Sequence, residues 1–164
     1  KNISQIRRKI GMVFQNSDHQ LFSQTVEEDV AFGPSNLDLP EEEIRNRVEN
    51  ALKQMNILPL AKRDVTQLSG GEKRRAALAG VLAMNPEAIL LDEPTAMLDP
   101  RSAREFAAHL QNLPVLKIIA THDLTFAARV CPECVILRKG EIAASGKTAD
   151  ILNRHELLLQ CGLE

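Results

Sequence analysis

The chain lacks any apolar run that approaches the roughly 18 residues a membrane-spanning helix needs, and it shows no signal peptide. Its longest apolar stretches, such as residues 88–91, have the length of a buried strand. Any association with a membrane is therefore expected to come through a partner protein.

An excess of charge of one sign is also missing. The sequence has 20 lysines and arginines against 22 aspartates and glutamates, a net charge of -2. Proteins that bind nucleic-acid phosphates usually carry a basic surplus, so we expect no nucleic-acid partner.

Cysteine is scarce: Cys131, Cys134 and Cys161 are an odd set in a chain without a secretory signal, which indicates a reducing, cytosolic compartment. Cys131 and Cys134 have the spacing of half a zinc or redox site. A structural zinc needs four ligands, so two ordinary thiols are the favoured interpretation, and the sequence does not settle their role.

The sequence is 44% hydrophobic and 26% charged, typical of one globular domain. Residues 10–14 are expected to form a short strand, and Thr25 to cap a helix through Gly33. Residues 34–40 form a connector in which Pro40 takes the first position of a helix over 41–55. A third helix begins after Ser69 and runs to about Met84.

The second half has a different pattern. Residues 88–91 and 115–120 are apolar runs, interrupted only by Lys117, and are typical of parallel strands covered by helices on both faces. Asp99-Pro100 starts a helix between them, which predicts a βαβ unit. A hairpin is expected over residues 135–145, with Thr148 capping a closing helix.

We therefore expect an α/β protein made of a single domain. Residues 1–24 and 85–164 would form the α/β core, and residues 25–84 an inserted all-helical subdomain.

Leu68-Ser69-Gly70-Gly71-Glu72 is the first candidate for chemistry. Ser69 and Glu72 form a capping-box pattern, in which each side chain satisfies a free amide at a helix start. Gly70 and Gly71 would let a ligand approach bare backbone amides, and such a helix start is an anion site.

The second candidate is the pair Asp92-Glu93, which follows the apolar residues 88–91. Both carboxylates should lie at the C-terminal edge of a parallel sheet, where such sheets bind ligands. Asp92 can hold hydrated Mg²⁺, and Glu93 can take a proton from an attacking water. Asp99 is a good helix N-cap, and His122 could contact a terminal phosphate.

Taken together, LSGGE (residues 68–72), ILLDEPTAMLD (89–99) and ATHD (120–123) resemble the nucleotide-binding domain of ABC transporters. Gln15, after the first strand, matches that family's Q-loop. Residues 18–34 are similar to the ATPases of energy-coupling-factor and cobalt or nickel importers. The resemblance covers nearly the entire chain and implies a P-loop NTPase-like, RecA-like fold that uses ATP and Mg²⁺.

The resemblance also implies roles for single residues. Gln15 would touch Mg²⁺ or the attacking water, and Asp92 would hold Mg²⁺ through water. Glu93 would be the general base, and His122 would contact the γ-phosphate. Glu72 stands where the family more often has glutamine.

Other implied roles involve partner chains. Ser69, Gly70 and Gly71 would grip the γ-phosphate of ATP bound to a second ATPase subunit, identical or different, and Asp99 would link the two sites. A surface around residues 16–34 would dock a transmembrane subunit, placing the protein at the cytoplasmic face of the membrane. The membrane subunits choose the cargo, expected to be a metal ion or a vitamin.

The family's phosphate-binding loop, Gly-x-x-x-x-Gly-Lys-Ser/Thr, occurs nowhere in the chain. Gly146-Lys147-Thr148 has its ending but Glu141 in place of the first glycine, and is expected to be a turn and helix cap. The true loop would precede Lys1. This chain alone is therefore expected neither to bind ATP tightly nor to hydrolyse it. It is also expected to expose an apolar edge of the sheet and to aggregate readily.

Two alternatives stay open beside the importer ATPase. One is a truncated, inactive fragment that acts only as a binding module. The other is an ABC ATPase of DNA repair or the ribosome, a class marked by long coiled coils, tandem domains or basic insertions that this sequence does not contain.

Overall fold

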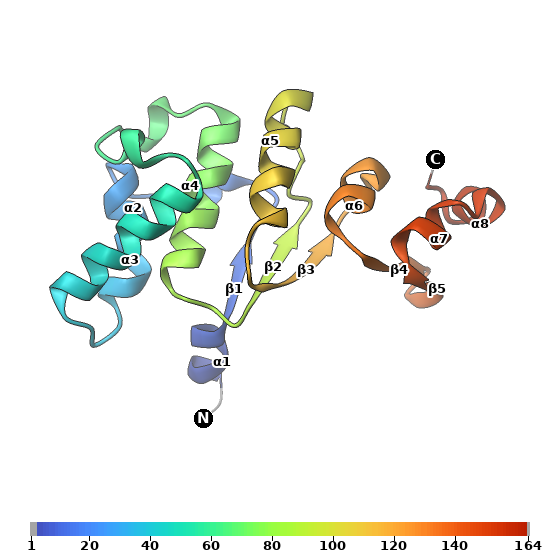
Figure 1. Cartoon of the computed structure of the whole chain (residues 1–164), viewed down its shortest axis with the longest axis horizontal. Coiled ribbons are helices and arrows are strands. Elements are labelled where there is room, and N and C mark those ends of the chain that lie inside the picture. The colour runs from blue at the N-terminus through green and yellow to red at the C-terminus, as the bar shows by residue number, and fades with distance from the viewer. Residues whose placement is uncertain (1–2, 164) are drawn as a thin grey trace. The chain divides into compact units, whose positions relative to one another are not determined.

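A computed structural model describes residues 3–163, which divide at Ala120 into two compact units (Figure 1). The first unit contains, in chain order, α1 (Ile3–Lys9), β1 (Ile10–Val13), α2 (Val26–Ser35), α3 (Glu41–Gln54), α4 (Gly70–Ala83), β2 (Ala88–Asp92), α5 (Pro100–Gln111) and β3 (Leu116–Ala120). The second contains α6 (Leu124–Val130), β4 (Glu133–Arg138), β5 (Glu141–Lys147), α7 (Thr148–Leu152) and α8 (His155–Cys161). Within 3–163 every helix is too short or too polar to cross a bilayer.

The first unit is built on a parallel sheet in the order β1-β2-β3. Val13 pairs with Leu91, and Asp92 pairs with Ala120. The chain leaves β2 through α5 and returns in β3, so the predicted βαβ unit is confirmed. Since the strands are parallel and in register, their C-terminal ends form one edge of the sheet.

One face of this sheet is covered. Val13, Ile89 and Leu91 are almost completely buried. Helix α4 lies against this face, and a Cβ built on Gly11 would lie only 2.2 Å from Cγ1 of Val81. Glycine is therefore required at this point of β1, because any side chain would push the helix away from the strand.

The opposite face is open within the described residues, so the prediction of helices on both faces is corrected here. Met12 and Ile118, which lie on either side of Leu90, are 41% and 58% exposed, and Leu116 is 64% exposed. Strands with so few polar residues are typical of sheets in which both faces are buried.

The segment between β1 and β2 contains three α-helices that pack on one another, α2, α3 and α4. Thr25 caps α2 in a capping box with Glu28, as expected for Thr25. Two boundaries differ from the prediction: α2 continues through Pro34 to Ser35, and Pro40 is the N-cap of α3 rather than its first residue. The assignment of this segment to a separate helical subdomain stays a prediction.

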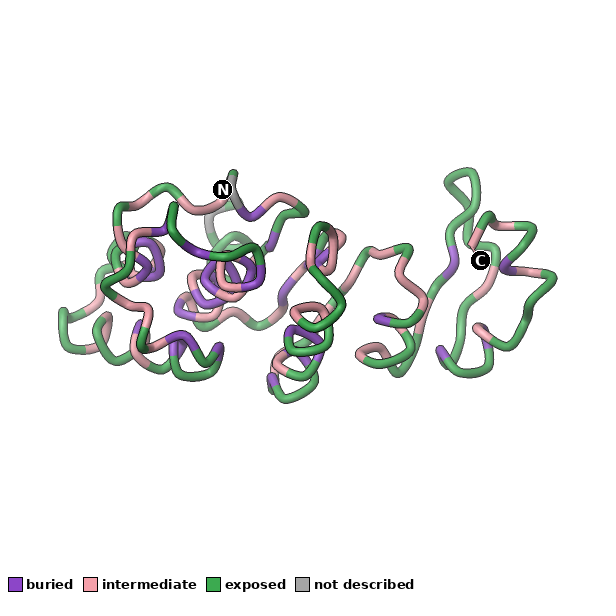
Figure 2. Tube along the Cα trace, turned by 90° about the horizontal axis from the view of Figure 1, so that it is seen from above, coloured by how far each residue is buried: buried purple, intermediate pink, exposed green. Residues whose placement is uncertain are grey.

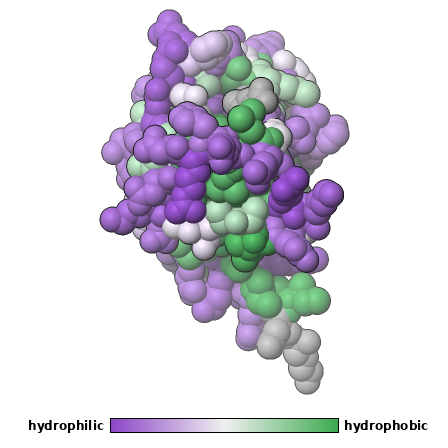
Figure 3. Space-filling view, turned by 90° about the vertical axis from the view of Figure 1, so that its right-hand side faces the viewer, coloured by the Kyte–Doolittle hydropathy of each residue, from purple (hydrophilic) through white to green (hydrophobic). Residues whose placement is uncertain are grey.

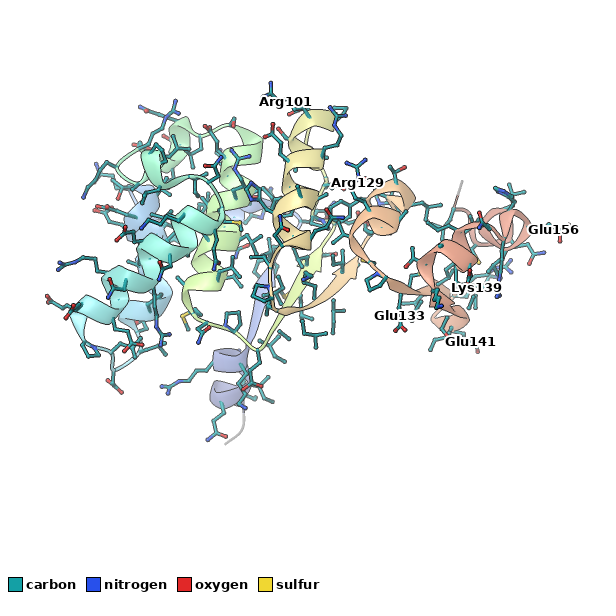
Figure 4. All side chains as sticks on the ribbon, in the orientation of Figure 1. Arg101, Arg129, Glu133, Lys139, Glu141 and Glu156 are labelled. Atoms are coloured by element: carbon teal, nitrogen blue, oxygen red, sulfur yellow. The ribbon has the colours of Figure 1, made fainter. Side chains whose placement is uncertain are left out.

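The second unit has a small core. Its buried cluster consists of Ile136, Ile151 and Leu158. Many more residues are buried in the first unit, as the purple segments of Figure 2 show. Hairpin β4–β5 turns at Lys139 and Gly140, both with positive φ. Figure 4 labels Lys139 and Glu141 at this turn. The hairpin leaves apolar side chains exposed at Val135, Leu137 and Ile142, and a space-filling view shows apolar surface in green among hydrophilic side chains (Figure 3).

The proposed cap at Thr148 is wrong in detail. Lys147 is the N-cap of α7, and Thr148 is its first helical residue, 2% exposed. The N–H of Thr148 donates to the carbonyl of Pro132 at 3.0 Å, which satisfies a first-turn N–H that has no partner within the helix. Gly146-Lys147-Thr148 therefore spans the end of β5 and the start of α7.

Candidate functional site

The start of α4 has the geometry predicted for it. The Ser69 hydroxyl accepts from the Glu72 N–H at 3.4 Å, and a Glu72 carboxylate oxygen accepts from the Ser69 N–H at 2.8 Å. Ser69 and Gly70 are exposed, so this helix start is open at the surface. A 14-residue helix with such a start offers backbone N–H groups and a favourable dipole to an anion.

The electrostatics of this start favour an ionised Glu72. The hydrogen bond from the Ser69 N–H is the largest cause that lowers the pKa of the Glu72 carboxyl below its ordinary value of 4.5. Arg63, 3.8 Å away, and Arg75 contribute attraction in the same direction. The capping box is therefore held together by a charged acceptor at neutral pH.

The acidic pair lies at the C-terminal edge of the sheet. Asp92 ends β2 and is exposed, and Glu93 follows it, half-buried. Gln15 follows neighbouring β1 by two residues, and the register Val13–Leu91 places it at the same edge. The structure therefore brings the Gln15 segment and the acidic pair to one edge, as expected of neighbouring parallel strands.

The backbone after the pair makes a tight turn. Glu93 has φ of 42°, and its N–H donates to the carbonyl of Ala120 at 2.8 Å. The Ala96 N–H donates to the Glu93 carbonyl at 3.0 Å, and Met97 has φ of 62°. Two non-glycine residues in the left-handed region cost free energy and persist only where their surroundings hold them.

Asp99 ends this turn as the N-cap of α5. Its carboxylate accepts from the N–H groups of Arg101 and Ser102 and from the Ser102 hydroxyl at 2.6 Å. The hydrogen bond from the Ser102 side chain is the largest cause that lowers the Asp99 pKa. Arg101, labelled at the start of α5 in Figure 4, pairs with Glu105, four residues further along the helix, at 2.9 Å.

The start of α4 and the start of α5 lie in contact. A Cβ built on Gly71 would lie 2.9 Å from Oγ of Ser102, the residue that binds Asp99. A Cβ on Gly70 would lie 4.0 Å from Cδ2 of Leu98. The two predicted segments, 69–72 and 95–99, thus form one surface, and Gly71 permits their approach.

His122 belongs to the second unit. It is exposed and follows the end of β3 by two residues. The next residue, Asp123, caps α6 by accepting from the Phe126 N–H at 2.8 Å, and its own N–H donates to the Thr121 hydroxyl. His122 therefore sits at a turn between a strand and a helix, as its sequence neighbours predicted.

The sequence reasoning missed two buried charged residues that are functional candidates, Asp29 and Arg74. The Asp29 carboxylate accepts from the N–H groups of Phe22 and Ser23, at 2.8 and 2.9 Å. A signal existed for Arg74, because helical spacing places it on the face of α4 that carries buried Leu78 and Val81. A charged residue on an apolar face needs partners of its own.

A groove lies beside this helix. It has a volume of about 260 Å³ and is lined by residues of α1, β1, α2 and α4 together with Gln20 and Phe22. Phe22 and Phe32 are 64% and 54% exposed and pack edge to face, with ring centroids 4.7 Å apart. Exposed aromatic side chains beside a groove are typical of a protein-binding surface.

Acidic pH should loosen the capping box. A carboxyl whose pKa is lowered by folding stabilises the fold above its unfolded-state pKa, and this contribution is lost as the pH falls through the folded-state value. We expect Glu72→Gln to unfold more readily than the wild type at about pH 7, and the difference in stability to shrink as the pH falls below 4.5, the ordinary pKa of the carboxyl. Urea unfolding of both proteins at several pH values measures this difference in stability.

The control for that prediction is Glu42→Gln, the same change at an exposed position in the first turn of α3. It should show little difference from the wild type at either pH. A gap for Glu72→Gln that stays constant over the whole range would contradict the role of its charge.

The family model described as ABC transporter matches residues 1–96. The energy-coupling factor transporter ATP-binding protein EcfA of Carboxydothermus hydrogenoformans is 47% identical over 167 residues, covering all of this chain and 62% of that protein. The nickel import ATP-binding protein NikO of Rhodobacter capsulatus is 45% identical over 163 residues, covering 96% of this chain and 64% of that protein. The chain thus spans less than two thirds of these relatives.

A solved structure shows the same likeness. The structure of cbiO1 from Clostridium perfringens, described as part of the ABC transporter complex cbiONQ, superposes with a TM-score of 0.88 at 40% identity. The match covers 99% of this chain and 66% of that one. The α/β, P-loop NTPase-like fold class is therefore confirmed, and this chain belongs to the ABC transporter family.

Proposed function

We propose that this chain forms the greater part of the ATP-binding and ATP-hydrolysing subunit of an ABC importer, of the energy-coupling-factor or cobalt/nickel type. One observation carries the proposal. The open, capped start of α4 packs against the Asp99 turn, while Gln15 and the pair Asp92-Glu93 share one edge of the sheet. The similarity to an energy-coupling factor transporter ATP-binding protein and to a nickel import ATP-binding protein supports the importer class.

The donor set at the sheet edge fits Mg²⁺. No group of three or more His, Cys, Asp or Glu side chains within the described residues could hold a metal by itself. Mg²⁺ needs no such cage, because it keeps several waters and takes phosphate oxygens. We assign its binding to Asp92 and Gln15; when bound, it neutralises charge on the phosphate oxygens.

In this proposal Glu93 takes the proton from the attacking water, since it directly follows Asp92 at the C-terminal end of β2. His122 contacts the γ-phosphate. Ser69, Gly70 and Gly71 bind the γ-phosphate of ATP held by the opposing subunit, through their amides and hydroxyl. Asp99, in contact with the same surface through Ser102, links the two sites.

The groove beside Phe22 and Phe32 is proposed to dock a transmembrane subunit. The exposed aromatic pair and the groove of about 260 Å³ provide apolar contact area for a helix of that subunit. The protein would then lie at the cytoplasmic face of the membrane as a peripheral subunit, paired with an identical or different ATPase. The cargo, a metal ion or a vitamin, would be chosen by the membrane subunits.

The test compares two proteins by calorimetry with Mg-ATP and by phosphate release. We expect the full-length protein, meaning this chain extended by a phosphate-binding-loop segment, to bind and hydrolyse ATP, and the 164-residue chain to do neither, because the lysine and amides that hold the β- and γ-phosphates are absent from its sequence. Micromolar binding by the 164-residue chain would contradict this expectation. A full-length protein without ATPase activity would favour the binding-module alternative.

A further inference from the structure

Arg74 is buried on α4, one turn beyond the capping box. It is 2% exposed, and burial lowers the pKa of its guanidinium. Keeping a cation inside a protein costs several kcal/mol unless good hydrogen bonds offset the cost. Its Nε is buried without a hydrogen-bond partner among the described atoms, so the burial is not fully compensated. Stability alone is a weak reason for an arginine at this position.

The hydrogen bonds of Arg74 go to carbonyl groups of two distant loops. Nη1 donates to the carbonyl of Phe14 at 2.6 Å, and Nη2 donates to that of Gln15 at 2.6 Å. Nη2 also donates to the carbonyl of Ala96 at 3.3 Å. These partners are 60, 59 and 22 residues away along the chain, so one planar group joins α4 to the segments after β1 and after β2.

Both loops carry residues of the proposed site. The first holds Gln15, and Gln20 closes it by accepting from the Phe14 N–H and donating to the Met12 carbonyl. The second runs from Glu93 to Asp99 and contains the two left-handed residues, Glu93 and Met97. Ala96 lies between them, so the Arg74 bond acts on the middle of a strained turn.

We propose that Arg74 is a positioning residue that sets Gln15 and the Glu93–Asp99 turn relative to the start of α4. This proposal rests on the proposed function. Movement of α4, when Ser69 and the glycines engage the opposing nucleotide, would then be passed through one guanidinium to the loops of this chain's own site. The guanidinium suits the task because its rigid planar fork presents donors on separate nitrogens in fixed directions, whereas the three donors of an ammonium group leave a single nitrogen on a flexible stem.

The test uses Arg74→Lys in the full-length protein, with Arg75→Lys as a matched control. Arg75 is the next residue of α4, and its guanidinium lies 3.7 Å from Glu105 of α5 rather than on the loops. We expect Arg74→Lys to lower kcat about 10- to 100-fold with KM for ATP changed little, because small displacements of catalytic groups have effects of this size. Arg75→Lys should change kcat less than about 3-fold, as expected of a partly exposed ion pair.

A second measurement does not depend on hydrolysis. Hydrogen exchange of the Ala96 and Leu98 amides, which bond within the turn, should become at least about 10-fold faster in Arg74→Lys and stay unchanged in Arg75→Lys. Should the lysine variant fail to fold, Arg74→Gln removes the buried charge and takes its place in both measurements.

The outcomes separate the two proposals. Slower kcat together with faster exchange supports the positioning role. Wild-type kcat per folded molecule, or unchanged exchange, would overturn it. An inactive wild-type protein would instead refute the ATPase function, and the exchange comparison would still decide whether Arg74 holds the two loops.

Discussion

In the full-length protein, Glu93→Gln is expected to lower the rate of ATP hydrolysis by about 10²- to 10⁴-fold, the range attributed to general acid–base catalysis. Glutamine has nearly the same size and can still accept hydrogen bonds, so the half-buried position and the turn at φ 42° should be kept. An amide cannot take a proton from water at neutral pH. ATP affinity should therefore change little, and the ATP-bound dimer should accumulate.

The measurements are steady-state phosphate release, Mg-ATP binding by calorimetry, and light scattering of the dimer. The matched control is Glu87→Gln, the same substitution just before the other end of β2, where the exposed side chain pairs with Lys9 at 2.8 Å. A surface ion pair contributes little, so hydrolysis in this variant should equal that of the wild type. Hydrolysis by Glu93→Gln at a near wild-type rate would remove Glu93 from the base role.

Local hydrogen bonding explains which parts of the site could be predicted from the sequence. The box of Ser69 and Glu72 and the cap at Asp99 involve partners within three residues, so a short motif contains all the groups that form them. The parallel sheet could be predicted because residues 88–91 and 115–120 are apolar without interruption except at Lys117. Patterns that repeat over a few residues specify the local structure.

The features that could not be predicted from the sequence depend on contacts between distant segments. The role of Arg74 follows from carbonyl groups 59 and 60 residues away, which no pattern in α4 contains. Helices α1, α6 and α8 have seven residues each, too few for an apolar period to stand out. Apolar runs alone also could not show that one face of the sheet is open in the described residues.

If the subunit forms a homodimer, two inactive variants should restore activity when they are mixed. In the proposed head-to-tail dimer, each ATP lies between Glu93 of one copy and Ser69 of the other. A mixed dimer of Ser69→Asp and Glu93→Gln would then hold one site with both changes and one site with neither. Random mixing makes half of the dimers mixed, so about a quarter of the wild-type rate should return.

Ser69→Asp is chosen because it keeps the fold and changes the charge. Aspartate can accept from the Glu72 N–H as serine does, so α4 should still begin at Gly70. The hydrogen bond from the Ser69 hydroxyl to the Glu72 carboxylate is lost, and the two carboxylates repel each other. Its carboxylate would repel a γ-phosphate brought to the helix start, and we expect a loss of about 10²-fold or more in the unmixed variant, as for removal of one anion-stabilising group. Ser69→Asn, which caps without charge, is the control and should retain far more activity.

The mixing experiment distinguishes action across the dimer from action within one chain. If Ser69 served the same nucleotide as Glu93 of its own copy, every site in a mixed dimer would carry one defect, and no activity would return. The proteins are mixed before ATP is added, dimer formation is followed by light scattering, and phosphate release is compared with that of each variant alone. Recovery requires that the start of α4, exposed at Ser69 and Gly70, faces the nucleotide of the other copy.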